Sequence, residues 1–541
     1  MFKRKSMLKR LITLCTIAIC TFMFTACNNS NQSQNSNEKS NEKDEVVIAV
    51  GGETSAGWDV TLDSAKYYRP LLFSKLTTIG EDGKIENDLA TEYSVSNDGL
   101  KWTFKIRDDV KFTDGQKLKA EDVAFTYNQC KENAAKIDMT MLEKAEAVDD
   151  ETVEFTLKKP MSTFLYQTAS LGIVPKHAYS KDFGENPIGS GPFKFVQWDK
   201  GQQLIAERND DYYGEKPKFK KVVMLFMDDD AAFAAAQAGT VDVIMTNSSL
   251  ALQNVEGYHL VKCSSIDTYG ITFPMNKSGQ VDADGNKIGN DVTSDIAIRK
   301  AFCYGIDRDK LCEDVLNGFG RPAYSVCDGM PWFNEKAVPD KSKLNLDTAK
   351  KILDENGWKD SDGDGIREKD GVKAEFNLIY PSNDGNRQAV AFASAEQAKE
   401  MGIKVNTQGY SWDEIYSLWY ENPIVVGGGN YTPKEVYDYY YGGVAGVETC
   451  NMEYYKNSTV DEYMDKALST TDENESNEYW KKAQLDGNIG ASMEGDAPIC
   501  WFTNTDHLYF VRDGLNIESN RIHTHRQGIQ IIDNITKWSF E

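Results

Sequence analysis

The stretch LATEYSVSNDGLKWTFKIRDDVKFTDGQKLKAEDVAFTY, residues 89–127, contains two turns, a strand and the first turns of a helix. Apolar and polar residues alternate over 102–106, which predicts a half-buried strand after the Asn-Asp-Gly turn at 97–99. An Asp-Gly turn at 114–115 leads to residues 120–127, where acids in the first turn suit the positive end of a helix dipole. The stretch therefore predicts a strand followed closely by a helix.

Strands and helices alternate in the rest of the chain as well. The apolar run VVIAV at 46–50 is bounded by charge and glycine, which predicts a buried strand, and 222–227 is similar. Residues 375–380 and 403–407 predict strands on either side of a helix at 388–401, which is a βαβ-like unit. We therefore expect an α/β (mixed α+β) fold with a second α/β region after residue 295.

The composition excludes one class of partner. The chain has 541 residues, with 60 Lys+Arg against 84 Asp+Glu and a formal net charge of −24. This length predicts about two to four domains. A chain this acidic repels phosphate backbones, which bind clustered Lys and Arg. Nucleic acid is therefore excluded as a partner.

The N-terminus has the features of a secretion signal. A basic cluster precedes the uncharged run LITLCTIAICTFMF at 11–24, which ends in small residues before Cys27. This pattern resembles the lipobox of bacterial lipoproteins, in which the cysteine is acylated; an uncleaved signal anchor is the alternative. Residues 28–45 hold no apolar side chain and predict a disordered tether. We expect a signal peptide at 1–26, a lipid-anchored tether at 27–45 and a location on the extracytoplasmic face of the cytoplasmic membrane.

The cysteines do not form the pattern of a disulfide scaffold. Seven follow Cys27, and an odd number cannot pair completely within one chain. No Cys-x-x-Cys spacing occurs, so zinc-ribbon and thioredoxin sites lack support. We expect mostly buried thiols, and one or two disulfides remain an alternative. The seven are Cys130, Cys263, Cys303, Cys312, Cys327, Cys450 and Cys500.

Several segments together resemble the solute-binding proteins of bacterial ABC importers, the peptide/nickel-binding family (family 5). They occur in the order 89–127, GSGPFKF at 189–195, ERNDDYY at 207–213, DIAIRKAFCYGIDRDKL at 295–311 and AKKILDENGW at 349–358. The resemblance implies two lobes joined by a hinge, with the ligand enclosed between them. It places lobe I at 46–268 plus 498–541, with an extra subdomain at about 91–179, and lobe II at 269–497.

The resemblance also implies a function and partners. The protein would capture a peptide-like solute or a nickel chelate and deliver it to the permease and ATPase subunits of an importer, as a monomer without a required cofactor. The sequence shows no Gly-x-Ser-x-Gly elbow, no His-Glu-x-x-His motif and no phosphate loop. We therefore expect no enzyme, and a surface-anchored hydrolase and a chaperone or adhesin are the alternatives.

The ligand contacts implied by the resemblance lie in both lobes. Tyr67, Tyr68 and Arg69 would face the ligand from lobe I, and Tyr269 lies near the first crossing between lobes. Within VVGGGNYTPKEVY at 425–437, Asn430 stands where peptide binders of the family have an Asp, and Tyr431 aligns with an aromatic contact of the nickel binders. The family's Trp position falls on Gly427 or Gly428, which predicts a larger pocket. The ligand, peptide or metal chelate, stays open.

Two further patterns suggest metal binding. The acidic turn DSDGDG at 360–365 is similar to a calcium loop, with Asp360, Asp362 and Asp364 as ligands, but its twelfth position is Gly371 instead of Glu. A solvated turn is the alternative. His523 and His525 are two residues apart, so in an extended segment both imidazoles lie on one face and would share a metal.

Overall fold

The computed structural model describes residues 43–541, apart from 52, 54–56, 63–68, 81–82, 134–138, 284, 448, 519–521 and 526–529. The predicted signal peptide and acylation site Cys27 lie outside the described residues, and so do Tyr67 and Tyr68. For Arg69 the structure describes only the backbone, with which helix α1 (Arg69–Leu72) begins. The ligand contacts expected of these three side chains stay predictions.

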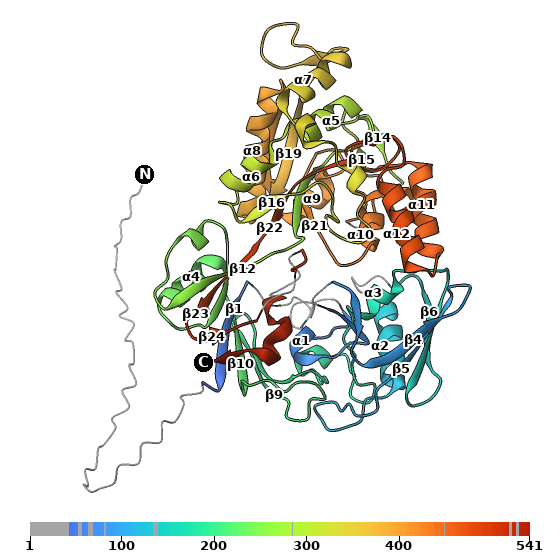
Figure 1. Cartoon of the computed structure of the whole chain (residues 1–541), viewed down its shortest axis with the longest axis vertical. Coiled ribbons are helices and arrows are strands. Elements are labelled where there is room, and N and C mark those ends of the chain that lie inside the picture. The colour runs from blue at the N-terminus through green and yellow to red at the C-terminus, as the bar shows by residue number, and fades with distance from the viewer. Residues whose placement is uncertain are drawn as a thin grey trace, which may run out of the picture. The chain divides into compact units, whose positions relative to one another are not determined.

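The largest sheet has seven strands in the order β12 (Tyr258–Cys263), β23 (His507–Arg512), β11 (Val243–Thr246), β1 (Glu45–Val50), β10 (Lys221–Phe226), β9 (Gln203–Arg208) and β8 (Phe193–Asp199) (Figure 1). β1 is the predicted VVIAV strand and has parallel partners on both sides. Its apolar run fits this central place because helix α4 (Asp229–Gln237) and the main core cover its two faces. Glu45, the last residue of the predicted tether, already pairs with Lys221 in the sheet.

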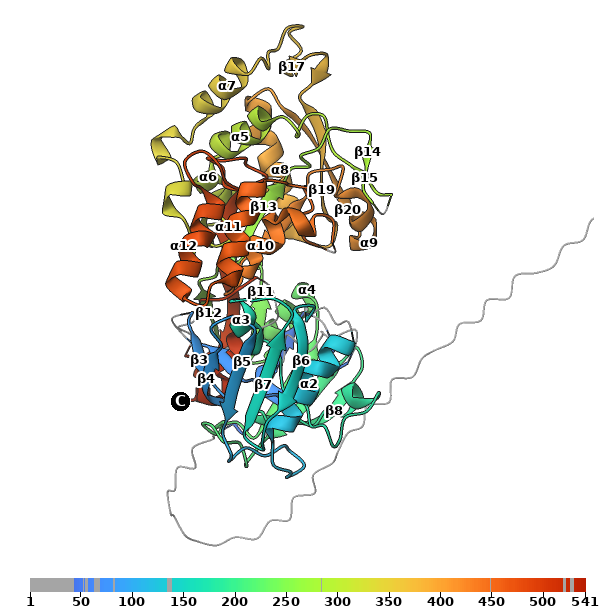
Figure 2. The ribbon, with the colours of Figure 1, turned by 90° about the vertical axis from the view of Figure 1, so that its right-hand side faces the viewer.

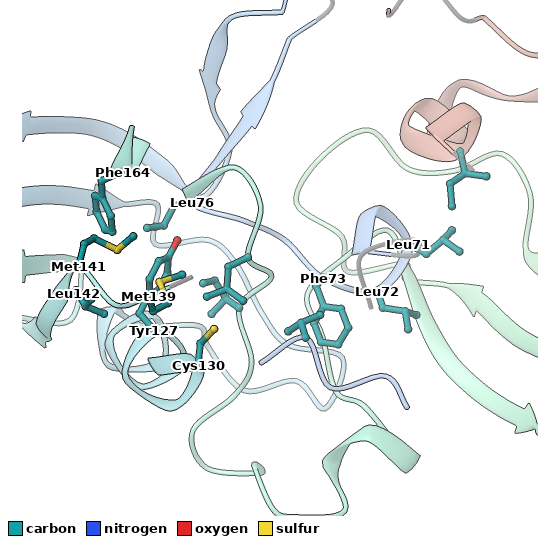
Figure 3. Packing of buried hydrophobic residues seen from close by; sticks show 14 of the residues in the cluster. Leu71, Leu72, Phe73, Leu76, Tyr127, Cys130, Met139, Met141, Leu142 and Phe164 are labelled. Carbon is teal, nitrogen blue, oxygen red and sulfur yellow. The ribbon is translucent and has the colours of Figure 1, made fainter. Parts of the chain in front are cut away.

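A second, antiparallel sheet contains strands from the stretch 89–127 and from residues 142–157. Its strands follow the order β4 (Ala90–Val95), β5 (Lys101–Ile106), β7 (Thr152–Leu157) and β6 (Leu142–Ala147). The predicted strand and helix are β5 and α2 (Ala120–Glu132), and both are confirmed. Figure 3 shows Tyr127 of α2 close to Phe164 of helix α3 (Phe164–Thr168), in a core that continues to Leu71 and Phe73. This shared core joins the small sheet to the region around α1.

Another group of strands and helices lies in the upper part of Figure 1. One sheet has the order β16 (Gly320–Pro322), β22 (Ile499–Thr505), β13 (Thr268–Thr272) and β21 (Val425–Gly428). β19 (Glu375–Pro381), α8 (Gly385–Glu400) and β20 (Lys404–Tyr410) form the predicted βαβ unit, because β19 and β20 pair in parallel. The remaining helices here are α5 (Ile296–Gly305), α6 (Arg308–Asp314), α7 (Leu346–Glu355), α9 (Trp412–Leu418), α10 (Lys434–Tyr440), α11 (Ser458–Ser469) and α12 (Glu473–Gln484). Short two-stranded sheets occur in both parts of the molecule: β2 (Thr77–Ile79) with β3 (Ile85–Asn87), β14 (Gln280–Val281) with β15 (Lys287–Ile288), β17 (Glu368–Lys369) with β18 (Val372–Lys373), and β24 (Leu515–Asn516) with β25 (Ser539–Phe540).

The chain crosses between the two groups of strands at two places, which lie close together at the junction seen in Figure 2. Residues 264–267 connect β12 to β13, and Asp506 connects β22 to β23. The predicted second crossing at 498 is therefore eight residues too early. β22 is buried along its whole length and pairs with both β13 and β16. Residues 499–505 therefore belong to the sheet that contains β13, and not to the predicted lobe I.

The structure bears on two expectations, one about crossing of the membrane and one about pairing of the cysteines. Within the described ranges, no helix combines the length and the apolar character that crossing a membrane requires. Six of the seven cysteines after Cys27 are buried and Cys450 is partly exposed. The structure records no disulfide among these described residues.

Glu453 carries a carboxyl group that is buried in the part of the protein formed by β13, β22 and the helices around them. It is 1 % exposed, and neither of its side-chain oxygens has a hydrogen-bond partner among the described residues. Burial raises the pKa of Glu453 well above its ordinary value of 4.5. The folded protein therefore binds the proton of the Glu453 carboxyl group more tightly than the unfolded chain does. Because of this carboxyl group, the free energy of unfolding decreases as the pH rises above about 4.5.

We predict that Glu453→Gln, which has the same shape without the charge, raises the melting temperature at about pH 8 and leaves it nearly unchanged at about pH 4.5. Thermal melts followed by circular dichroism across this pH range measure the effect. The exposed Glu256→Gln serves as control and should follow the wild type. A Glu453→Gln profile that runs parallel to the wild type would contradict a buried, protonated carboxyl group.

Candidate functional site

A cavity of about 420 Å³ lies at the carboxyl end of β21, where the second group of strands meets the C-terminal segment 522–525. Side chains from α8, α9, β21 and α10 line it, together with His525. The C-terminal segment is held between the crossing and the β21 loop, because the His525 N–H donates to the Gly429 carbonyl at 2.7 Å and that of His523 to Ser264 at 2.8 Å. The backbone thus fixes where the His525 ring enters the cavity.

His525 has one ring nitrogen bound to the protein and one directed elsewhere. Its Nδ1 lies 2.7 Å from Oδ1 of Asp267, a fully buried residue in the first crossing. Its Nε2 has no hydrogen-bond partner in the described part of the chain, and the side chain, 22 % exposed, lines the cavity. An imidazole held through Nδ1 in this way presents the Nε2 lone pair to a ligand.

Asp267 keeps its negative charge although it is buried. Burial alone would raise its pKa, but nearby His525 and hydrogen bonds from His507 and His525 lower the pKa of Asp267 below its ordinary value. His507 contributes Nε2, which lies 3.2 Å from Oδ2 of Asp267. An ionised carboxylate accepts hydrogen bonds only, so both imidazoles donate to it.

Arg387 brings a positive charge to the same cavity. The side chain, only 8 % exposed, lies on α8, with its guanidinium 5.2 Å from the Trp412 ring centre and 5.8 Å from that of Tyr269. Its Nε is 3.6 Å from Oδ2 of Asp384, too long for a hydrogen bond, and Nε has no hydrogen-bond partner among the described residues. A buried guanidinium whose only close carboxylate among the described residues makes no hydrogen bond with it favours binding of a further carboxylate, which pairs with Arg in a two-point geometry.

Gly427 explains how His525 and Arg387 come together. A Cβ on Gly427 would lie 2.6 Å from Cε1 of His525 and 2.9 Å from Nη2 of Arg387. Both side chains therefore lie directly over the β21 backbone, where a larger residue would displace them. We predicted that glycine here enlarges the pocket; the structure shows that these two side chains occupy the space.

Aromatic rings of α9 and of Trp419, which directly follows it, form another wall of the cavity. The Trp412 and Tyr416 ring centres are 5.9 Å apart, and those of Tyr416 and Trp419 are 4.9 Å apart with the rings nearly perpendicular. Tyr416 is 48 % exposed, so part of its ring is accessible to a ligand. This wall suits the apolar part of a small ligand, beside the charged groups of His525 and Arg387.

Asn430 and Tyr431, both predicted ligand contacts, differ in their surroundings. Asn430 lines the cavity, but its amide Nδ2 donates to Oε1 of Glu435 at 3.0 Å. Glu435 also accepts the backbone N–H groups of Gly429 and Asn430, and burial raises its pKa to about 7. Tyr431 is buried, and its hydroxyl donates to the Ile522 carbonyl. Tyr431 thus holds the segment that carries His525.

Tyr269 and His523, also predicted as site residues, are buried behind the cavity. Tyr269 is 1 % exposed on β13, and its ring lies against the Arg387 guanidinium. His523 is 1 % exposed, and its Nδ1 lies 3.1 Å from Nδ1 of His507. His523 and His525 therefore contact different protein partners, and this geometry does not support a metal shared between the two alone.

The predicted calcium loop forms a turn on the surface. Nζ of Lys373 lies 3.1 Å from Oδ2 of Asp362 and also contacts the Asp364 carboxylate. Among the described residues, the three potential ligands that approach within 4.8 Å of one another are Asp360, Asp362 and Glu368, without Asp364. Calcium binding at this turn stays a prediction.

The family profile of bacterial extracellular solute-binding proteins, family 5 (middle region), matches residues 84–451. The chain belongs to this family. It is 32 % identical over 487 residues to Protein XP55 of Streptomyces lividans, which covers 86 % of this chain and 85 % of that protein. It is 30 % identical over 573 residues to the oligopeptide-binding protein AppA of Bacillus subtilis, which covers 99 % of each chain.

A solved structure shows the same fold. The crystal structure of NikZ from Campylobacter jejuni in complex with Ni(L-His) covers 92 % of this chain and 99 % of its own, with a TM-score of 0.77 at 24 % identity. The two groups of strands are therefore the two lobes of this family's fold. The protein is the solute-binding component of an ABC importer, and its relatives are extracytoplasmic binding proteins instead of enzymes.

We predict that Asp267→Asn lowers the free energy of unfolding by about 3 kcal/mol at neutral pH, because an amide cannot accept from both imidazoles and leaves one buried donor unpaired. Urea denaturation measures this loss, with the exposed Asp210→Asn as control. A carboxylate with a lowered pKa stabilises the fold above its unfolded pKa and loses this effect as the pH falls. The difference between wild type and variant should therefore shrink below about pH 4, and an unchanged urea midpoint at neutral pH would contradict the network.

Proposed function

We propose that the protein captures a transition-metal chelate with a free carboxylate, unchanged, and delivers it to a membrane permease with its ATPase. The observation that supports this proposal is the approach of His525 and Arg387 over Gly427 in one cavity. The imidazole offers a nitrogen ligand, and the guanidinium offers two donors for a carboxylate. The metal is cargo here, and the protein supplies part of its coordination.

The environment of His525 supports a metal ligand. Imidazole nitrogen binds nickel, copper and zinc well. Metal-bound histidines commonly donate their other ring nitrogen to a carboxylate, as Nδ1 of His525 does to Asp267. Negative Asp267 also compensates a cation at His525, and Arg387 compensates the carboxylate of the chelator. A small chelating amino acid fits the cavity volume of about 420 Å³.

A peptide is the second candidate, because Arg387 would also bind a peptide's terminal carboxylate. The name of the B. subtilis relative specifies oligopeptides, whereas the C. jejuni structure holds Ni(L-His). A free amino terminus needs a carboxylate partner when it is buried. Three acids at or beside the cavity are engaged: Asp267 by two imidazoles, Glu435 by three N–H groups and Asp438 by Lys434 at 2.6 Å. This favours the chelate.

We predict that the wild type binds nickel with L-histidine more tightly than a pool of unmodified tripeptides. His525→Gln and Arg387→Met should each weaken chelate binding by about 10-fold or more, since each removes one charged or coordinating contact. Isothermal titration calorimetry with nickel alone, nickel plus histidine and the tripeptide pool gives the comparison. Arg208→Met, at a side chain that is 26 % exposed and lies outside the cavity, is a control for loss of one positive charge.

Two results would overturn the chelate proposal. Tight binding of tripeptides that is insensitive to added nickel would restore the peptide function. Unchanged chelate affinity in His525→Gln would show that the metal site lies elsewhere in the protein.

We further propose that Cys27 carries a lipid anchor that keeps the protein at the outer face of the cytoplasmic membrane. The small residues before Cys27 and the apolar run at 11–24 support this location. Cys27→Ser should shift the protein from the detergent phase to the aqueous phase in phase partitioning and release it into the medium. Unchanged partitioning would contradict lipidation at Cys27.

A further inference from the structure

We propose that His507 and His523 are positioning residues, which orient the ligand-binding ring of His525 through Asp267. This inference rests on the proposed function, because it takes His525 as the residue that contacts the ligand. Neither His507 nor His523 lines the cavity, and both are nearly fully buried, at 3 % and 1 % exposure. Their effect on a ligand must therefore pass through other residues.

The contacts form one continuous chain away from the cavity. Nδ1 of His525 lies 2.7 Å from Oδ1 of Asp267, and Nε2 of His507 lies 3.2 Å from Oδ2 of the same carboxylate. Nδ1 of His507 is 3.1 Å from Nδ1 of His523. Tyr509 lies at the far end, with its hydroxyl 3.5 Å from Nδ1 of His523.

Hydrogen-bond chemistry gives this chain a direction. Ionised Asp267 accepts only, so His525 donates through Nδ1–H and His507 through Nε2–H. A neutral His507 then has a lone pair on Nδ1, which accepts from Nδ1–H of His523. With this pattern, Nε2 of His525 carries the lone pair that faces the cavity. Loss of the donor on His523 removes the partner that keeps the proton of His507 on Nε2, and so disturbs the contact to Asp267.

The chain of contacts also connects the cavity to both lobe crossings. Asp267 ends the first crossing, and its carbonyl accepts the Thr505 N–H at 2.8 Å just before the second. His507 begins β23 directly after the second crossing. His523 pairs with Ser265 of the first crossing in a parallel bridge. The orientation of the His525 ring therefore depends on segments whose backbone must change when the lobes close.

A simple packing role would not require these atoms. A buried polar side chain is costly unless it is hydrogen-bonded, and an apolar residue of similar size fills a core without that cost. Here, two imidazoles line up nitrogen to nitrogen and end on the carboxylate that holds His525. This arrangement matches the carboxylate and hydrogen-bond partners that orient metal-bound histidines, whose loss typically lowers metal affinity about 10- to 100-fold.

The test compares disruptive with conservative variants. His523→Leu and His507→Leu remove the contacts, whereas His523→Asn keeps a donor at the Nδ1 position and His507→Gln keeps one at the Nε2 position. We expect the two Leu variants to bind nickel plus L-histidine about 10-fold more weakly, with a shifted visible absorption band of the bound nickel. His523→Asn and His507→Gln should stay within about threefold of the wild type.

A second measurement needs no ligand and works on variants of low stability. Long-range ¹H–¹⁵N spectra of the imidazoles report which nitrogen of His525 carries the proton, and the chain has only five histidines to assign. The wild type, His523→Asn and His507→Gln should show Nδ1–H at His525, and the Leu variants should show a mixture.

The outcomes separate the two proposals. Wild-type binding that the Leu variants leave unchanged, in affinity and in absorption spectrum, overturns the positioning role and leaves the proposed function intact. Equal losses in the Leu and the conservative variants also overturn it, because they indicate general damage to the core. A wild type that does not bind nickel plus histidine overturns the proposed function and the inference together.

Discussion

The charge of Asp267 constrains the structure around the crossing between the lobes. A carboxylate with no exposure to solvent must be surrounded by donors, and Asp267 obtains them from two imidazoles that approach from different parts of the chain. One imidazole belongs to β23 of lobe I and the other to the C-terminal segment. The same residue accepts the backbone N–H of Thr505 through its carbonyl. Satisfying one buried charge therefore holds together both crossings and the edge of the ligand cavity.

Arg387 forms a contrasting case, a buried positive charge that has an ion pair with Asp384 at 3.6 Å but no hydrogen bond on Nε among the described residues. Its ring contacts with Trp412 and Tyr269 hold the guanidinium in place without satisfying its donors. Both oxygens of Asp267 are thus hydrogen-bonded within the protein, whereas Nε of Arg387 has no hydrogen bond in the described part of the chain. The cavity thus has one imidazole and one guanidinium over the same residue of β21, which we propose as a metal ligand and an anion-binding group. A ligand that carries both a metal and a carboxylate satisfies the two groups at once.

Local sequence patterns predicted most of the secondary structure. The buried run of β1, the alternation in β5, the acidic first turn of α2 and the βαβ unit around α8 depend on residues close in sequence, so periodicity was sufficient. The second crossing was misplaced because the apolar run of β22 fits either lobe, and only its pairing with β13 decides between them.

The site was predicted in part, because its contacts join distant segments. His525 was expected to bind a metal, but Asp267 lies 258 residues away from it and has no motif around it. Arg387 lies on α8 and gave no signal either, since an arginine at a helix start is common on protein surfaces. Glycine at position 427 pointed to the site, but it was interpreted as enlarging the pocket. The structure shows that the side chains of His525 and Arg387 occupy the space above this glycine. The identity of the cargo and the lipid anchor at Cys27 stay predictions.

The most direct measurement is native mass spectrometry, with elemental analysis, of the protein purified without denaturation and without added ligand. We predict one bound metal ion per protein together with a small carboxylate chelator, and loss of both from the Arg387→Met variant purified in parallel. A peptide bound without metal in the wild type, or the same cargo retained by Arg387→Met, would contradict it.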